Sequence, residues 1–169
     1  YVHGYDSREN RRLQDQANTL VELLHSDTSY PAGSRILEVG CGVGAQTVTL
    51  ARKSPNASLL SIDRFEESII EARGALETLG LNNVQFLCAD IFNLDLETES
   101  FDHVFVCHVL EHLSQPENAL AILQSLIKVG GTITVIEGDH GSTYFYPDSE
   151  AAQKAIQCQV ELQKRAGGG

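Results

Sequence analysis

The sequence predicts an α/β fold, in which helices cover both faces of a doubly wound, mainly parallel sheet. Two observations predict it. Short, nearly continuous apolar runs alternate along the chain with longer segments whose apolar residues recur at helical spacing. Strands that are apolar throughout are typical of parallel sheets, because the connecting helices bury both faces. With 169 residues and no internal repeat or linker, the chain is expected to form a single domain, 1–169.

Five segments are predicted as strands because each is a short apolar run bounded by turn residues. They cover Arg35–Val39, Ser58–Asp63, Val84–Cys88, Phe101–Cys107 and residues 132–137. A turn at Gly130 and Gly131 introduces the last of them. Ligands of such sheets bind outside the carboxyl ends of the strands, so the residues after each strand are candidates for a site.

Helical periodicity and end signals predict the helices that connect these strands. The predicted helices cover residues 7–25, 45–53, 66–79 and 114–128, and a last one begins at Asp148 or Ser149. Their ends carry a capping-box-like start at Asp6 and Ser7, a C-cap at Gly80 and Pro116 in a first turn.

The net charge of −11 argues against a nucleic-acid partner, because phosphates would be repelled and no basic stripe offsets this. A small molecule or a protein side chain is the expected substrate. No apolar run approaches the about 18 residues of a membrane helix, so no membrane partner is predicted. The four cysteines are widely spaced without a C-x-x-C pair, which suits a reducing cytosol and predicts a cytoplasmic protein.

The loop after the first strand, EVGCGVGA at residues 38–45, fits two templates. Gly40-x-Gly42-x-x-Ala45 matches the dinucleotide fingerprint, in which glycines let the backbone approach a pyrophosphate. Glu38-x-Gly40-x-Gly42-x-Gly44 matches the first motif of S-adenosylmethionine (SAM) methyltransferases. A carboxylate at Glu38 would repel a pyrophosphate, whereas it suits the positively charged SAM.

Acidic residues follow the second and third strands. Asp63 lies 19 residues after Gly44, where a carboxylate can accept both hydroxyls of a ribose. Asp90, in CADI, can accept a hydrogen bond from an adenine amine. The alternative for both residues is to cap the helix or turn that follows. Together with the glycine loop, they indicate an adenosine cofactor.

These segments resemble the class I SAM-dependent methyltransferases, in particular the small-molecule enzymes of ubiquinone and menaquinone biosynthesis. The resemblance is carried by ILEVGCGVGAQT at 36–47, SID at 61–63, CADI at 88–91, FDHVFVCHVLEHL at 101–113 and the Gly130–Gly131 turn. It spans residues 34–137 and implies SAM as the cofactor, with the methyl group transferred by in-line displacement.

The resemblance also implies how the cofactor is held. Glu38 would contact the methionine amino end, Asp63 the ribose, and Asp90 with Ile91 the adenine. The full set of implied cofactor-binding residues is Glu38, Gly40, Gly42, Asp63, Arg64, Asp90, Ile91 and Cys107. The implied layout is a helical lid (1–30), a cofactor-binding core (34–137) and an acceptor loop with the last helix (138–169). The family completes its sheet with an antiparallel hairpin, which is not found before Gly169, so a truncated chain is expected.

His108-Val-Leu-Glu111-His112 matches the inverted zinc-peptidase motif H-x-x-E-H. No third ligand follows at a plausible distance, so no metal is predicted. The resemblance implies instead that the segment begins a helix near the transferred methyl group, which makes His108 and His112 candidate substrate contacts.

His140 and Asp139, just beyond the fifth strand, are the candidate catalytic bases, because methyl transfer needs a deprotonated nucleophile. For His140, a solvated loop position is the simpler alternative. Tyr5 and Tyr144 are further candidate substrate contacts, in a lid and an acceptor pocket, and packing against a neighbouring helix is the alternative for each.

The sequence therefore predicts a cytoplasmic enzyme that transfers a methyl group from SAM to a small-molecule acceptor. An NAD-dependent oxidoreductase that uses the G-x-G-x-x-A loop is one alternative, and a non-catalytic SAM-binding module is another. The acceptor and the oligomeric state, a homodimer included, stay open.

Overall fold

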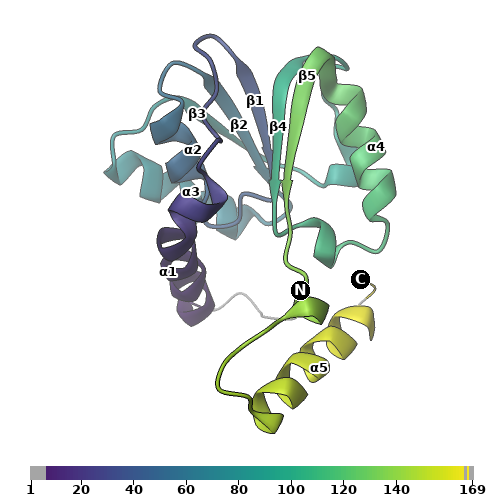
Figure 1. The fold of residues 1–169 in the computed structure, drawn as a ribbon. Coiled ribbons are helices and arrows are strands. Elements are labelled where there is room, and N and C mark those ends of the chain that lie inside the picture. Colours follow the sequence, from purple (N-terminus) through teal and green to yellow (C-terminus); the bar gives the residue numbers. More distant parts are fainter. Residues whose placement is uncertain (1–6, 166, 168–169) are drawn as a thin grey trace.

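The computed structural model describes residues 7–165 and 167 and places one sheet between layers of helices (Figure 1). The sheet has five parallel strands in the order β3-β2-β1-β4-β5. They are β1 (Arg35–Val39), β2 (Ser58–Asp63), β3 (Val84–Cys88), β4 (Phe101–Cys107) and β5 (Ile127–Ile136). The predicted doubly wound parallel sheet is confirmed. The direction of winding changes between β1 and β4, and a ligand crevice is expected there.

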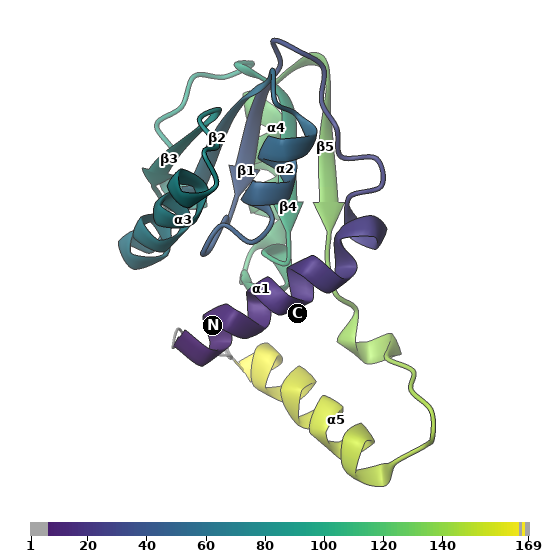
Figure 2. The same cartoon turned by 90° about the vertical axis from the view of Figure 1, so that its left-hand side faces the viewer.

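The helices cover both faces of the sheet and its carboxyl edge. In Figures 1 and 2, α2 (Thr47–Lys53) and α3 (Glu66–Thr78) lie on one face and α4 (Pro116–Leu126) on the other. The helices α1 (Ser7–Leu24) and α5 (Glu150–Arg165) lie beyond the arrowhead ends of the strands. Short 3-10 helices follow three strands: η1 (Ile91–Asn93), η2 (Leu110–His112) and η3 (His140–Ser142).

Alternation along β4 builds a core on each side of the sheet, because successive strand residues point to opposite faces. Val104 and Val106 belong to the apolar cluster that contains Leu123 of α4. Phe105 belongs to the cluster on the other face, with Leu50 of α2. Burying a large apolar side chain contributes about 1.5–3 kcal/mol. These cores therefore fix the strands whose ends carry the candidate site.

The junction of α4 and β5 is where the predicted boundaries were wrong. The sequence predicted helix to residue 128 and strand from 132, but α4 ends at Leu126 and β5 begins at Ile127. The register runs from Phe101↔Ile127 to His103↔Thr132, so the glycine pair lies in a bulge within the strand. A glycine pair is compatible with either a turn or a bulge. The other boundaries agree to within about two residues.

The strand β5 forms one edge of the sheet as described, and no antiparallel strand occurs among residues 7–165. Two of its apolar side chains, Ile133 and Val135, are 39% and 42% exposed. Within the same residues, no helix combines the length and the apolar character needed to cross a membrane.

Candidate functional site

The carboxyl ends of β1, β2, β3 and β4 open into one cavity of about 730 Å³. This volume is typical of small-molecule sites, which occupy about 300–1,000 Å³. Residues of α1 and α5 also line it. Nine residues that the sequence singled out are brought together in its wall: Gly40, Gly42, Asp63, Arg64, Asp90, Ile91, Cys107, His108 and His112.

The first backbone N–H groups of the glycine loop already have partners within the protein. Those of Gly40 and Cys41 donate to the carbonyl oxygen of Ile62, at 2.8 and 3.0 Å. The N–H of Gly42 donates to Asp63 Oδ2 at 2.9 Å. A loop that binds pyrophosphate needs such N–H groups to point at the phosphate oxygens. These three donors are therefore not available to a dinucleotide.

Two glycines of the loop have different surroundings, one packed against another segment of the protein and one open. A Cβ atom at Gly40 would lie 2.4 Å from Cγ2 of Val109, so this glycine lets the segment after β4 pack against the loop. A Cβ atom at Gly42 would have no heavy atom within 4 Å, so this glycine faces open space. Their φ angles of 69° and 51° are in the left-handed region, which L side chains disfavour. Gly42, rather than Gly40, leaves room for a ligand.

The acids that follow β2 and β3 both act as caps and both line the cavity. Asp63 Oδ1 accepts a hydrogen bond from the N–H of Phe65 at 3.0 Å. Asp90 Oδ1 accepts one from the N–H of Phe92 at 2.9 Å, which caps η1. Both acids therefore do cap the segment that follows them, which was the alternative to a role in binding. The cap uses only Oδ1 of Asp90, so its Oδ2 can accept a hydrogen bond from a ligand. Arg64 lies beside them, with its guanidinium 5.0 Å from the Phe65 ring centre.

Glu38 lies beneath the glycine loop rather than in the cavity wall. Its side chain is 2% exposed, and its Oε2 accepts a hydrogen bond from the Ser61 hydroxyl at 2.6 Å. Burial raises the pKa of Glu38 to about 7, and the hydrogen bond from Ser61 opposes this shift. The carboxyl group is therefore balanced between its charged and neutral forms near neutral pH. Its predicted contact with the methionine amino end stays a prediction.

Cys107 lies in the cavity wall at the end of β4. Burial raises the pKa of its thiol to about 12, with further increases from Glu137 and Glu38. The group is therefore a neutral thiol at physiological pH, which argues against a nucleophilic role. The residue lines the cavity, and the contact of its backbone with the cofactor stays a prediction.

Gln46 is a cavity residue that the sequence gave no reason to select. Its Oε1 lies 2.6 Å from His25 Nε2, and the other ring nitrogen of His25 lies 2.7 Å from the Thr28 hydroxyl. His25 is wholly buried and stacks on Phe105, 5.5 Å between ring centres. Burial lowers the pKa of His25, so the ring is neutral and can orient the Gln46 amide.

His108 and His112 both lie close to the same oxygen of the Glu111 carboxylate. Glu111 Oε1 is 3.9 Å from His108 Nδ1 and 3.5 Å from His112 Nε2. The side chain of Glu111 is only 12% exposed, and all three residues line the cavity. His108 has a φ of 55°, which is uncommon for a residue other than glycine and often marks a functional site.

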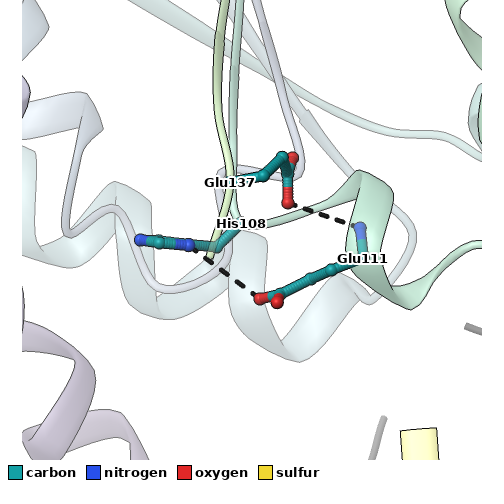
Figure 3. A group of neighbouring side chains, drawn as sticks. All are labelled: His108, Glu111 and Glu137. Carbon is teal, nitrogen blue, oxygen red and sulfur yellow. Dashed lines mark hydrogen bonds and ion pairs between the residues drawn. The ribbon is translucent and has the colours of Figure 1, made fainter. Parts of the chain in front are cut away.

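Glu137, directly after β5, holds this segment in place (Figure 3). Its Oε1 accepts hydrogen bonds from the N–H groups of Val109 and Leu110, at 3.1 and 2.9 Å. Its Oε2 accepts from the N–H of Glu111 at 3.3 Å. A carboxylate that caps a helix start in this way is well stabilised. The sequence indicated Glu137 only as the end of a strand, because its partners are 26 to 28 residues away.

The same region contains the one group of potential metal ligands found among the described residues. Ligand atoms of His108, Glu111 and Glu137 all lie within 4.8 Å of one another, a group that contains Glu137 in place of His112, the second histidine of the motif. However, the Glu137 carboxylate already accepts three backbone hydrogen bonds. A metal would compete with all three. We therefore assign no metal here, and the absence of one stays a prediction.

Of the other predicted site residues, Asp139 and Tyr144 are not among the described residues that line the cavity. Asp139 is exposed, and its carboxylate caps η3 by accepting hydrogen bonds from the Gly141 N–H, at 2.9 Å, and from the Ser142 hydroxyl. The backbone of His140 begins η3, and Tyr144 is 88% exposed. Tyr5 lies outside the described residues. The roles expected of these four residues stay predictions.

Known proteins that are similar in sequence and fold to this chain include methyltransferases. Residues 31–166 match the methyltransferase-domain family. The chain belongs to this family. An uncharacterised methyltransferase of Schizosaccharomyces pombe is 33% identical over 134 residues, 76% of this chain and 48% of that protein. A demethylmenaquinone methyltransferase of Staphylococcus saprophyticus is 26% identical over 140 residues, 82% and 59% of the respective chains.

The crystal structure of a SAM-dependent methyltransferase from Aquifex aeolicus has the same fold as this methyltransferase domain. The TM-score is 0.71 at 22% identity, over 93% of this chain and 88% of that chain. The predicted family and fold are therefore confirmed, and these relatives support SAM rather than NAD as the cofactor. The chain spans about half the length of the first curated relatives it matches, 40% and 48%.

Proposed function

We propose that this methyltransferase domain binds SAM in the cavity at the carboxyl ends of the strands and transfers its methyl group to a small molecule. One observation carries the proposal. The N–H groups of Gly40, Cys41 and Gly42 have partners within the protein, whereas Asp63 and Asp90 border the same cavity. A glycine loop with these donors already used and two carboxylates beside it suits a positively charged adenosine compound better than a pyrophosphate.

Each residue then has a distinct task in holding the cofactor. Asp63 accepts hydrogen bonds from the ribose hydroxyls, and Asp90 with Ile91 borders the adenine. Gly42 leaves space for the methionine portion, since nothing lies within 4 Å of where a side chain would begin. The buried Glu38 carboxyl group, close to half charged at neutral pH, favours the nearby ammonium group.

SAM supplies an electrophilic methyl group on a sulfonium, so the protein mainly has to position the acceptor and exclude water. Ala17 and Leu24 of α1 and Gln159 of α5 also line the cavity. Its volume of about 730 Å³ suits a small molecule as the acceptor. His140 and Asp139 stay candidates for a base from the loop after β5.

Titration with S-adenosylhomocysteine (SAH) and with NADH tests the proposal. We expect SAH to raise the melting temperature and NADH to leave it unchanged. Stabilisation by NADH alone would identify the protein as an oxidoreductase instead. Tight binding of SAH without methyl release to any acceptor would favour a non-catalytic SAM-binding module.

A further inference from the structure

We propose that His108, Glu111 and His112, here called the η2 cluster, bind the amino group of the acceptor, so that the methylated atom is a nitrogen. This inference rests on the proposed methyl transfer and adds to it the chemical class of the substrate. It assigns a recognition role to Glu111, a residue that neither the glycine-loop motif nor the adenosine-binding acids required.

The geometry of the cluster is that of a cation site with a proton acceptor beside it. Oε1 of Glu111 lies 3.9 Å from His108 Nδ1 and 3.5 Å from His112 Nε2, and the Glu111 side chain is nearly buried. A carboxylate that is removed from water attracts an ammonium group strongly. In addition, His108 Nε2 is buried and forms no hydrogen bond with any described residue. A ligand in the cavity could supply the missing partner.

The charges that face Glu111 favour a cationic acceptor over an anionic one. His108 and His112 face it from its own segment, and Glu137 faces it from the end of β5. Arg12 of α1 lines the same cavity, where its Nη1 donates to Gln16 Oε1 at 2.8 Å. A phenolate or carboxylate acceptor in the cavity would have to lie beside the Glu111 carboxylate, which disfavours it. An ammonium group instead gains from that charge.

The chemistry of N-methylation gives His112 and Glu111 each a step. An acceptor ammonium has no lone pair, so it first gives a proton to the imidazole of His112, which Glu111 stabilises in its charged form. The nitrogen lone pair then forms a bond to the methyl carbon. The carbon–sulfur bond breaks, and its electron pair stays on sulfur, which becomes a neutral thioether. The imidazole finally releases its proton to solvent.

The test measures binding of the acceptor, with the full chain saturated with SAH. Phenethylamine and 2-phenylethanol, which have nearly the same size, serve as acceptor probes in calorimetric titrations. We expect the amine to bind more tightly than the alcohol. Glu111→Gln should weaken amine binding at least about tenfold, because a buried charge pair loses one partner, and should leave alcohol binding unchanged. Glu117→Gln, at an exposed position in the first turn of α4, is the matched control.

Further measurements distinguish the ways in which the inference can fail. Titration of Glu111→Gln with SAH reports whether that variant is folded and whether its cofactor site is intact. If SAH binds but the amine is not preferred, or if Glu111→Gln binds the amine as wild type does, the inference is wrong. It is also wrong if amine binding is lost in EDTA and restored by Mn²⁺, which would indicate a metal site. If wild type does not bind SAH, the proposed function itself fails.

NMR of the histidine side chains gives a readout that a purely structural role would not move. The ring ¹⁵N resonances of His108 and His112 should shift when phenethylamine binds to the SAH complex. They should remain in place when 2-phenylethanol binds. Equal shifts with both probes would contradict recognition of the amino group.

Discussion

Two short turns at the same edge of the sheet are capped in different ways. The turn η1, on the cofactor side, is capped by Asp90, which immediately precedes it. The turn η2, on the proposed acceptor side, is capped by Glu137, which comes from the end of another strand and accepts three hydrogen bonds. The cap of η1 is thus a local signal in the sequence. The acceptor side depends on contacts between segments far apart in the sequence.

The two sides meet where Val109 packs against Gly40, and a substitution there should have the largest effect. In Gly40→Ala, the new Cβ atom would lie 2.4 Å from Val109 Cγ2, on a backbone with a φ of 69°. Overpacking and left-handed backbone strain together should lower the free energy of unfolding by about 3 kcal/mol. Urea denaturation measures this.

The double variant Gly40→Ala/Val109→Ala separates the two contributions. Removing the Val109 side chain relieves the overpacking but leaves the backbone strain, so about half of the loss should return. No recovery in the double variant would mean that Val109 is not what restricts Gly40, and that the two sides are less closely coupled than proposed.

This coupling also explains how much could be predicted from the sequence. The glycine loop, Asp63 and Asp90 were predictable, because each fixes the conformation of its own neighbours. Gly42 permits a left-handed backbone, and Asp63 and Asp90 each accept a hydrogen bond from the N–H group two residues later in the chain. Glu137 and Gln46 were not predictable, because their roles arise only when distant segments pack together. The same applies to the bulge in β5, since a glycine pair alone does not indicate whether it precedes a strand or interrupts one.

The buried Glu38 should make stability depend on pH in the range around neutrality. Its pKa of about 7 in the folded protein is above the ordinary value of 4.5. A raised folded-state pKa contributes stability that is complete below pH 4.5 and is lost as pH rises towards 7. Without ligand, the free energy of unfolding should therefore fall by about 2 kcal/mol between pH 5.5 and 7.5.

Glu38→Gln is the variant that isolates this contribution. The amide retains an oxygen that can accept from Ser61, but it cannot ionise, so the difference between the two pH values should shrink by about 2 kcal/mol. Denaturation of both proteins at pH 5.5 and 7.5 measures it. An unchanged pH dependence in Glu38→Gln would mean that another group dominates, and that the Glu38 carboxyl group is better solvated than its burial indicates.

Asp63→Asn should weaken SAH binding more than a matched substitution elsewhere in the sheet. Asp63 accepts from the N–H groups of both Gly42 and Phe65, and an amide would place a donor against one of them. We expect about tenfold weaker SAH binding, equivalent to about 1.4 kcal/mol. Asp102→Asn is the matched control, because Asp102 accepts from the Arg35 N–H and from Lys128 at the opposite ends of the strands. Equal loss of SAH affinity in both variants would indicate a general loss of structure.

The comparison between the two caps can be tested directly with Glu137→Gln and Asp90→Asn, which have the smallest expected effects. Glu137→Gln removes the charge from a cap that accepts three hydrogen bonds and should cost about 1 kcal/mol, since hydrogen bonds to charged acceptors are stronger than neutral ones. Asp90→Asn retains a good capping residue for a single bond and should cost about 0.3 kcal/mol. Hydrogen exchange of the Val109 and Leu110 amides should accelerate only in Glu137→Gln. If both variants left those amides equally protected, the segment that carries the η2 cluster would be held by its own packing, and its dependence on the distant strand would have to be abandoned.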